Sequence, residues 1–365
     1  MGALKKAVFT VFVWDFGVRI VALFGKWLLV ERYAPLSFIA VFLRHNFLLW
    51  SWSNFDGEHY LAIAAFGYHI RNGFPEYAFF PLYPLLIKVL SFIIRDYLLA
   101  GLLVSQLSLV AALYYMARWA ALRHVKLSPW LLLLSPGAVF LAATYTEPLF
   151  IALAAATIVS ADQKQWGRAT IITALATATR VNGIFLVAFL AIRMWQSHVP
   201  ILRTAYCLLL AALGLLSYMA FLFWKIGDPL AWYHAQSAWG KATATSPLVT
   251  IASYIRAIST DFHPDLTHLV VIFEVVVTVI ALTLFIYALK KRLFDLSYLV
   301  YLGGNLFLPL ATGSLGSMPR FYLTLFPLLA AVPLLPKLPR TMYYGLSASI
   351  AVVGVILFTR GYWFA

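Results

Sequence analysis

Long apolar runs separated by short polar breaks dominate this chain. They lie near residues 8–30, 97–117, 128–143, 148–161, 169–179, 183–197, 204–224, 266–288, 295–311, 320–335 and 342–359. Of the 365 residues, 63% are hydrophobic and only 11% are charged, which leaves too few polar side chains to cover a water-soluble domain. Backbone amides in lipid must be paired within the chain, and no segment alternates as in a membrane barrel. We therefore expect an all-α polytopic membrane protein with about eleven transmembrane helices, forming a single domain over residues 1–365.

The first apolar stretch begins like a signal sequence, but it is too long and carries Asp15, Arg19 and Lys26. We expect a retained first helix, in which Asp15 and Arg19 neutralise each other at i, i+4 spacing. The net charge of +14 would suit nucleic acid, but the basic residues are scattered rather than gathered in a stripe, so no nucleic-acid partner is expected. Cys207 is the only cysteine, which excludes an intrachain disulfide.

Basic residues in the short loops favour one orientation in the membrane. They place the amino terminus in the cytoplasm and the two long loops, near residues 31–96 and 225–265, on the extracytoplasmic side, at the cell membrane if the source is prokaryotic. This orientation requires residues 80–95 to form an interfacial helix rather than a span. Most acidic residues then lie outside, so any chemistry is expected there.

The first long loop carries the segment WSNFDGEHY from Trp52 to Tyr60. Asp56 and Glu58, beside His59 and close to the membrane surface, suit an acid/base site for a lipid or a lipid-linked group. The alternative is a solvated loop whose acidic residues serve solubility. These three side chains are a weak metal signal because no second ligand cluster accompanies them, so we expect no metal or other cofactor.

Three turns between apolar segments carry further charges. Glu147, between Thr146 and Pro148, either caps the next helix or contributes to a site. Arg180 stands at membrane depth in the turn TRVNG, where it either binds a phosphate or pairs structurally with Glu147. Arg320 either clamps a phosphate or extends to lipid head groups.

The second long loop alternates aromatic and polar residues from Asp228 to Lys241. Trp232 and His234 lie within it. Such a pattern suits a wall on which a sugar stacks, and it equally suits an interfacial anchor, which is the commoner use of Trp and Tyr in membrane proteins.

Several of these blocks, in this order, resemble one known family. The blocks are FDGEHY at Phe55 to Tyr60, Gly67 with Tyr68, AFFPLYP at Ala78 to Pro84, Ser135-Pro136 through Glu147, RVNG at Arg180 to Gly183, and Arg320 to Tyr322. Together they resemble the PIG-V family of mannosyltransferases. The resemblance implies a GT-C fold and a polyprenyl-phosphate sugar donor. It also implies that Asp56 is the base, Glu58 the second acid of an Asp-x-Glu pattern, and Arg180 the arginine of an Arg-x-Asn-Gly turn.

The resulting hypothesis is an inverting hexosyl transfer, of mannose by resemblance, to a lipid-linked or glycolipid acceptor whose identity is left open. Asp56 would deprotonate the acceptor hydroxyl while the lipid phosphate leaves from the opposite face. The residues expected to bind the donor phosphate are Arg180, Arg320, His59 and Lys241. The residues expected to bind the rest of the substrates are Glu147, Tyr145, Asn182, Trp52, Tyr68, Trp232 and His234.

Two other classes of membrane protein compete with this hypothesis. A lipid or glycolipid transporter or flippase predicts charges along a path through the midplane and some repeat symmetry. A structural membrane subunit would not explain Asp56 and Glu58 beside an aromatic loop. Because the charges concentrate at one face, we favour glycosyl transfer.

Overall fold

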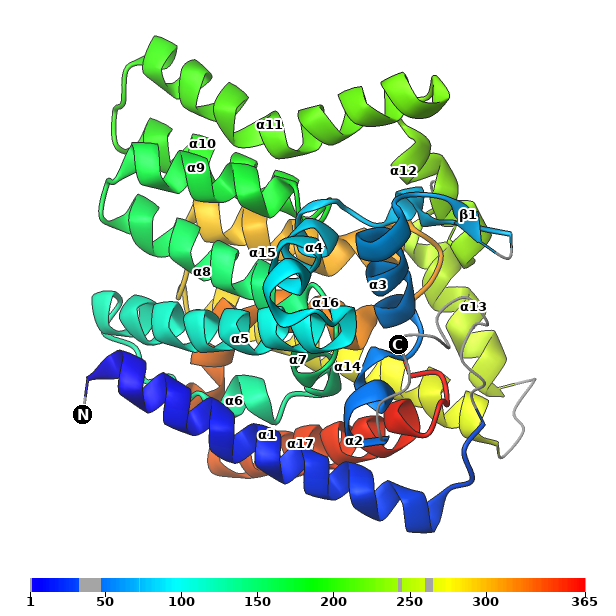
Figure 1. Ribbon diagram of the computed structural model, residues 1–365. Coiled ribbons are helices and arrows are strands. Elements are labelled where there is room, and N and C mark those ends of the chain that lie inside the picture. Colours follow the sequence, from blue (N-terminus) through cyan, green and yellow to red (C-terminus); the bar gives the residue numbers. More distant parts are fainter. Residues whose placement is uncertain (1, 33–46, 72, 242–244, 260–264, 365) are drawn as a thin grey trace.

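The computed structural model describes residues 2–32, 47–71, 73–241, 245–259 and 265–364. Helices form nearly all of its regular structure, and the exception is a short antiparallel pair of strands, β1 (Ile70–Arg71) and β2 (Phe74–Pro75) (Figure 1). Parts of both expected outer loops, namely residues 33–46, 72, 242–244 and 260–264, fall outside the described residues.

Within the described residues, five helices are long and apolar enough to cross a membrane. They are α1 (Ala3–Leu28), α5 (Tyr97–Leu122), α11 (Ile201–Ile226), α14 (Leu266–Lys290) and α17 (Lys337–Thr359). The expectation of an all-α membrane protein is therefore confirmed. The count of about eleven spans stays a prediction, since the remaining apolar helices are shorter than the roughly 20 residues that a straight span needs.

The shorter apolar helices form the centre of the bundle. They are α8 (Glu147–Asp162), α9 (Trp166–Thr177), α10 (Gly183–Gln196) and α15 (Leu296–Ala311). Helix α8 is buried on almost every side, as expected of a helix that is apolar all round. It packs between α5 and α9, while α9 also packs against α11, and Figure 1 shows these four helices one above another.

Two stretches expected to be single helices are broken, so the prediction was wrong there. Residues 128–143 form α6 (Trp130–Leu133) and α7 (Val139–Ala142), with Pro136 and Gly137 between them. Residues 320–335 form α16 (Met318–Thr324) and the 3-10 helix η4 (Phe326–Leu334). Proline lacks the amide hydrogen that an α-helix needs, and prolines occur in both stretches. A side chain at Gly137 would also collide with the backbone of Pro319, so the break lets the two stretches pack closely.

Short elements gather at one end of the bundle. They are α2 (Phe47–Trp50), η1 (Ser51–Ser53), α3 (Asp56–Phe66), η2 (Glu76–Ala78), α4 (Leu82–Ile94), α12 (Ala231–His234), η3 (Ala235–Trp239) and α13 (Pro247–Ser259). Helix α4 confirms the helix expected over residues 80–95, and its 13 residues are too few for a straight span. It buries Tyr83 and Ile87 and exposes Phe92 and Ile93. Its interfacial position stays a prediction.

Ion pairs also occur within and between the longer helices. Asp15 and Arg19 pair at 2.7 Å, which confirms the expected i, i+4 contact in α1. At the ends of α8 and α10, Arg193 bridges Asp162 at 2.5 Å and Asp295 at 3.2 Å. Because Asp295 also caps α15, this cluster ties three helices at the end of the bundle opposite Asp56.

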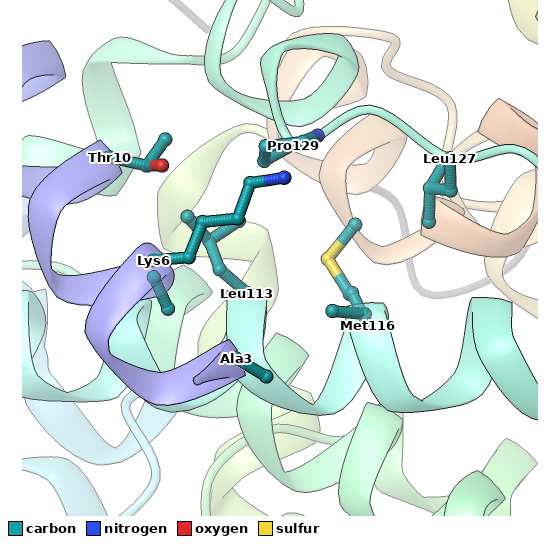
Figure 2. Close-up of a pocket in the computed structure, with 9 residues that line it drawn as sticks. Ala3, Lys6, Thr10, Leu113, Met116, Leu127 and Pro129 are labelled. Carbon is teal, nitrogen blue, oxygen red and sulfur yellow. The ribbon is translucent and has the colours of Figure 1, made fainter. Parts of the chain in front are cut away.

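A small groove of about 130 Å³ lies between α1, α5 and the segment before α6. Figure 2 shows Lys6 there beside Thr10 and Met116. Its lining includes Lys6 but no acidic residue, so the groove lacks the paired acid and base that transfer chemistry needs.

Candidate active site

A cavity of about 700 Å³ opens among the short elements at the Asp56 end of the bundle. Its walls come from the start of α3, the turn before α10, the segment around η3, the end of α15 and the start of α16. Six of the expected site residues line it, namely Asp56, Arg180, Asn182, Trp232, Lys241 and Arg320. The tertiary structure therefore brings together residues from four separate sequence blocks.

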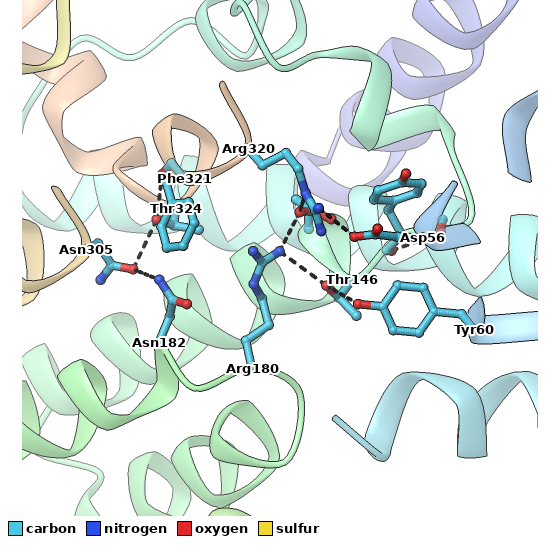
Figure 3. Close-up of polar contacts among 12 residues, drawn as sticks. Asp56, Tyr60, Thr146, Arg180, Asn182, Asn305, Arg320, Phe321 and Thr324 are labelled. Carbon is cyan, nitrogen blue, oxygen red and sulfur yellow. Dashed lines mark hydrogen bonds and ion pairs between the residues drawn. The ribbon is translucent and has the colours of Figure 1, made fainter. Parts of the chain in front are cut away.

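Two arginines share one buried carboxylate at the base of this cavity. Arg320 donates from Nε to Oε1 of Glu147 at 2.7 Å and from Nη1 to Oδ2 of Asp56 at 2.6 Å. Arg180 donates from Nη1 to the same Glu147 oxygen at 2.5 Å and to Oγ1 of Thr146 at 3.2 Å. Figure 3 shows Asp56, Arg180 and Arg320 converging. Each buried charge thus has an opposite charge beside it, as burial requires.

This geometry bears on three alternatives that the sequence left open. The pairing of Arg180 with Glu147 is present, yet Arg180 also lines the cavity. Glu147 begins α8, but its carboxylate bonds to the two arginines, and α8 shows no side-chain cap. Arg320 is buried and points inward to Glu147 and Asp56 rather than outward to lipid head groups.

Positive charge exceeds negative charge around the cavity. Arg180, Arg320 and Lys241 face Asp56 and Glu147, which leaves an excess of one positive charge when all five are ionised. Burial, reinforced by Arg320, lowers the pKa of Lys241 to about 8. The ring of Phe321 lies 5.8 Å from both the Arg180 guanidinium and the Lys241 ammonium. A cavity of this kind suits an anion with several oxygens, such as a phosphate.

Tyrosines line the base of the charged cluster. The Tyr145 ring lies 5.0 Å from the Arg320 guanidinium, and the Tyr60 hydroxyl is 3.4 Å from Oγ1 of Thr146. Burial, with the nearby Asp56, raises the pKa of Tyr60 above its ordinary value. The phenol therefore stays protonated at neutral pH.

An amide network fixes the Arg180 turn relative to α16. Asn182 donates to Oδ1 of Asn305 at 2.7 Å, and Thr324 donates to the same oxygen at 3.1 Å (Figure 3). Asn182 was predicted from the sequence as a substrate-binding residue, whereas Asn305 and Thr146 were not predicted as site residues. A signal for Asn305 was present, because an amide inside an otherwise apolar helix needs a buried partner.

Several expected site residues lie outside the cavity lining. Glu58 and His59 are buried on α3, and Nδ1 of His59 is 3.5 Å from Oε1 of Glu76. Trp52 is fully buried, with the Arg19 guanidinium 5.4 Å from its ring.

Two more expected residues are placed apart from the charged cluster. Tyr68 donates to the carbonyl of Phe79 at 2.8 Å and packs against Tyr218. His234 is exposed and pairs with Asp228 at 2.8 Å. Trp232, by contrast, lines the cavity.

The cavity also has walls that the sequence analysis did not anticipate. They include Thr245, Ser314, Ser317 and Trp363. Gln236 and Trp239 line the cavity too, and they belong to the segment from Asp228 to Lys241 that suited either a sugar-stacking wall or an interfacial anchor. Hydroxyl and amide groups beside aromatic rings suit a sugar, because they combine hydrogen bonding with apolar contact. Isolated Ser, Thr and Gln residues in loops carry no signal of their own.

A sequence model of the family described as mannosyltransferase (PIG-V) matches residues 27–224, which is more than half of the chain. The chain belongs to the PIG-V mannosyltransferase family. This confirms the resemblance seen in the sequence blocks. The match includes Asp56, Glu147 and Arg180, whereas Lys241, Arg320 and Trp363 lie beyond it.

Similar proteins of the PIG-V family include three mammalian enzymes named GPI alpha-1,6-mannosyltransferase 2. The Homo sapiens protein is 33% identical over 176 residues, which cover 44% of this chain and 34% of that protein. The Cricetulus griseus and Rattus norvegicus proteins are each 32% identical over 160 residues, covering 39% of this chain and 31% and 32% of theirs. The match thus spans about a third of the length of these relatives. No solved structure matches the chain. Neither the family nor the relatives support the alternative of a transporter.

Proposed function

We propose that this PIG-V family member is a membrane glycosyltransferase that moves mannose from a polyprenyl-phosphate donor to a lipid-linked or glycolipid acceptor. The observation that carries the proposal is the pairing of Asp56 with Arg320 in a cavity that also holds Arg180 and Lys241. One carboxylate beside several cations is the set of groups needed to deprotonate a hydroxyl and release a phosphate.

In the proposed reaction Asp56 takes the proton of the acceptor hydroxyl as its oxygen bonds to the anomeric carbon. The bond from that carbon to the donor phosphate breaks on the opposite face, so the configuration inverts. Arg180, Arg320 and Lys241 stabilise the negative charge that collects on the departing lipid phosphate. Buried Glu147 holds the two guanidiniums in place.

The ion pair between Asp56 and Arg320 suggests how the base becomes available. In the free protein Arg320 neutralises Asp56 at 2.6 Å. A donor phosphate competes for the same guanidinium because it offers several charged oxygens. Donor binding therefore loosens the hold of Arg320 on Asp56 and frees the carboxylate for the acceptor hydroxyl.

Asp56 is a better candidate for the base than Glu58. Both lie in the first turn of α3. Asp56 lines the cavity and bonds to Arg320, whereas Glu58 is not among the residues that line the cavity. A base must come within hydrogen-bond reach of the proton it accepts. Glu58, which is buried in the same turn, is then not the base.

The three cations also take the place that a divalent metal holds in many transferases, so we propose a metal-independent reaction. Among the described residues, no three His, Cys, Asp or Glu side chains gather as a candidate metal site. His59, which the sequence suggested as a further cation, pairs with Glu76 and is not needed in this scheme.

We further propose that the site faces the extracytoplasmic side of the membrane, with the amino terminus in the cytoplasm. The distribution of basic residues supports this orientation. Trp27 at the end of α1 and Trp224 at the end of α11 are 88% and 83% exposed, as residues at a membrane interface are. A GT-C fold with about eleven spans fits the short paired helices α8, α9 and α10.

The experiment that tests this function uses the full chain reconstituted in liposomes. Polyprenyl-phosphate mannose and polyprenyl-phosphate glucose are offered separately with a glycolipid acceptor, and the products are identified by mass spectrometry and their anomeric configuration by NMR. We expect a mannosylated glycolipid of inverted configuration. Transfer of glucose alone would refute the proposal that mannose is the transferred sugar. Retention of the anomeric configuration would refute a direct attack by the acceptor assisted by Asp56.

A further inference from the structure

The residue before Asp56 has a backbone conformation that side chains rarely adopt. Phe55 has φ 59° and ψ −119° and occupies the first central position of a reverse turn, closed by the bond from the Gly57 amide to the Asn54 carbonyl at 3.3 Å. These angles are typical of a type II′ turn, in which this position is usually glycine. Asp56 is the next residue and begins α3.

Aromatic contacts from the far end of the chain hold this turn. The Phe55 ring centroid lies 5.7 Å from that of Phe358 and 5.2 Å from that of Trp363, which it meets edge to face. Asn54 donates from Nδ2 to the carbonyl of Phe358 at 2.7 Å. The two residues before Asp56 are therefore fixed by the end of α17 and the segment after it.

The choice of phenylalanine at this position is informative. Glycine would meet the backbone requirement without steric cost. A phenylalanine keeps such a strained backbone conformation only where contacts with the surrounding structure hold it there. Backbone strain of this kind is common at functional sites. Here the side chain contacts Trp363, which also lines the cavity and is 48% exposed.

We propose that Trp363 is a positioning residue, which acts through Phe55 to hold Asp56 in the orientation that faces Arg320 and the acceptor. This inference rests on the proposed function for its catalytic consequence. The contact itself does not depend on that function. Because Trp363 forms part of the cavity wall, a ligand that packs on its exposed surface also tightens the turn that carries the base.

The first test measures the contact without any enzyme assay. Hydrogen exchange of the peptide spanning residues 51–60 is compared among wild type, Trp363→Ala and Trp363→Phe in the same liposomes. We expect faster exchange in Trp363→Ala, near wild-type exchange in Trp363→Phe, and unchanged exchange in α8 for both. Trp224→Ala is the matched control, because it removes an exposed tryptophan at the same end of the bundle. Unchanged exchange of residues 51–60 in Trp363→Ala overturns the proposal.

The second test measures transfer. Trp363→Ala is expected to lower kcat about 10- to 100-fold, the scale of a misplaced catalytic group, with the donor KM within about twofold of wild type. Trp363→Phe should restore most of the rate because it keeps an aromatic edge for Phe55. A donor KM that rises while kcat is unchanged would show that Trp363 binds donor instead, and would overturn the positioning role.

Phe55→Gly separates positioning from folding. Glycine adopts the turn without strain but loses the contact with Trp363, so we expect a similar melting temperature together with the same loss of kcat. A fully active Phe55→Gly enzyme overturns the proposal. If wild type transfers no mannose while Trp363→Ala still loosens residues 51–60, the proposed function fails and the contact stands.

Discussion

Arg320 and Asp56 lie 264 residues apart in the sequence, yet the Nη1 of one donates to the Oδ2 of the other at 2.6 Å. The same guanidinium donates to Glu147, so Arg320 at the start of α16 contacts both the start of α3 and the start of α8. In the proposed mechanism, an arginine in this position joins the base to the phosphate site. Its variants and those of its partners should therefore change binding and turnover in different ways.

Replacing Asp56 by asparagine should separate donor binding from catalysis. We expect Asp56→Asn to lower kcat by about 10²- to 10⁴-fold, the usual contribution of a general base. The dissociation constant of the donor should stay the same or fall, because the carboxylate no longer competes with the phosphate for Arg320. Single-turnover transfer and equilibrium binding of the donor in liposomes measure the two quantities.

Asp228→Asn is the matched control for this variant. Asp228 is at the same end of the molecule and pairs with exposed His234, outside the cavity lining. It should leave both quantities unchanged. Near-normal turnover of Asp56→Asn would refute the assignment of the base.

Removing the buried carboxylate behind the arginines should destabilise the fold. Glu147→Gln leaves two guanidiniums facing each other without their shared counter-ion, and breaking a buried ion pair from one side costs about 3–5 kcal/mol. Thermal unfolding in detergent should show a melting temperature several degrees lower, with a raised donor KM. A melting temperature equal to that of wild type would contradict the view that Glu147 holds the arginines.

Donor binding should depend on pH through Lys241. Its pKa of about 8 means that the ammonium is charged below that pH and neutral above it. The charged form binds phosphate, so kcat/KM for the donor should be constant from pH 6 to 7 and fall as the pH rises through about 8. Lys241→Arg keeps its charge throughout and should remove this decline. If the two profiles coincide, Lys241 does not contribute to donor binding.

The amide network should be energetically coupled. Asn305→Ala leaves the amide donor of Asn182 without its buried acceptor, which costs about 1–3 kcal/mol, whereas Thr324 keeps its bond to the carbonyl of Phe321 at 2.7 Å. A double-mutant cycle of Asn182→Ala and Asn305→Ala, measured by unfolding, should give a coupling of about 0.5–3 kcal/mol. Additive effects would show that Asn305 does not hold the Arg180 turn.

Metal independence can be tested directly by chelation. We expect EDTA to leave the rate of mannose transfer unchanged, because Arg180, Arg320 and Lys241 supply the positive charge at the phosphate. The assay compares chelated enzyme with enzyme supplied with Mg²⁺ or Mn²⁺. If EDTA abolishes transfer and either ion restores it, the positively charged side chains at the phosphate are insufficient for the reaction.

Local patterns were enough to predict some of the residues that the structure brings together in the cavity. Asp56 was predicted from its place beside Glu58 in the first long loop, and Arg180 from the cost of an arginine at membrane depth. The structure brings both side chains together with Arg320 in one cavity. His59, Trp52 and Tyr68 were predicted in the same way, from residue types that suit a sugar or a phosphate, but they are not among the residues that line the cavity. Their neighbours, Glu76, Arg19 and Tyr218, are distant in sequence and use these side chains elsewhere.

The sequence by itself determined the membrane class, the helical fold and the family, because hydropathy, the need to pair backbone amides and short motifs are all local properties. Only the tertiary structure decided that Glu147 is shared by two arginines, that Asn305 braces the Arg180 turn, and that Trp363 reaches Phe55. These contacts join helices through side-chain packing. Packing depends on which helix faces lie together, and no single segment carries that information.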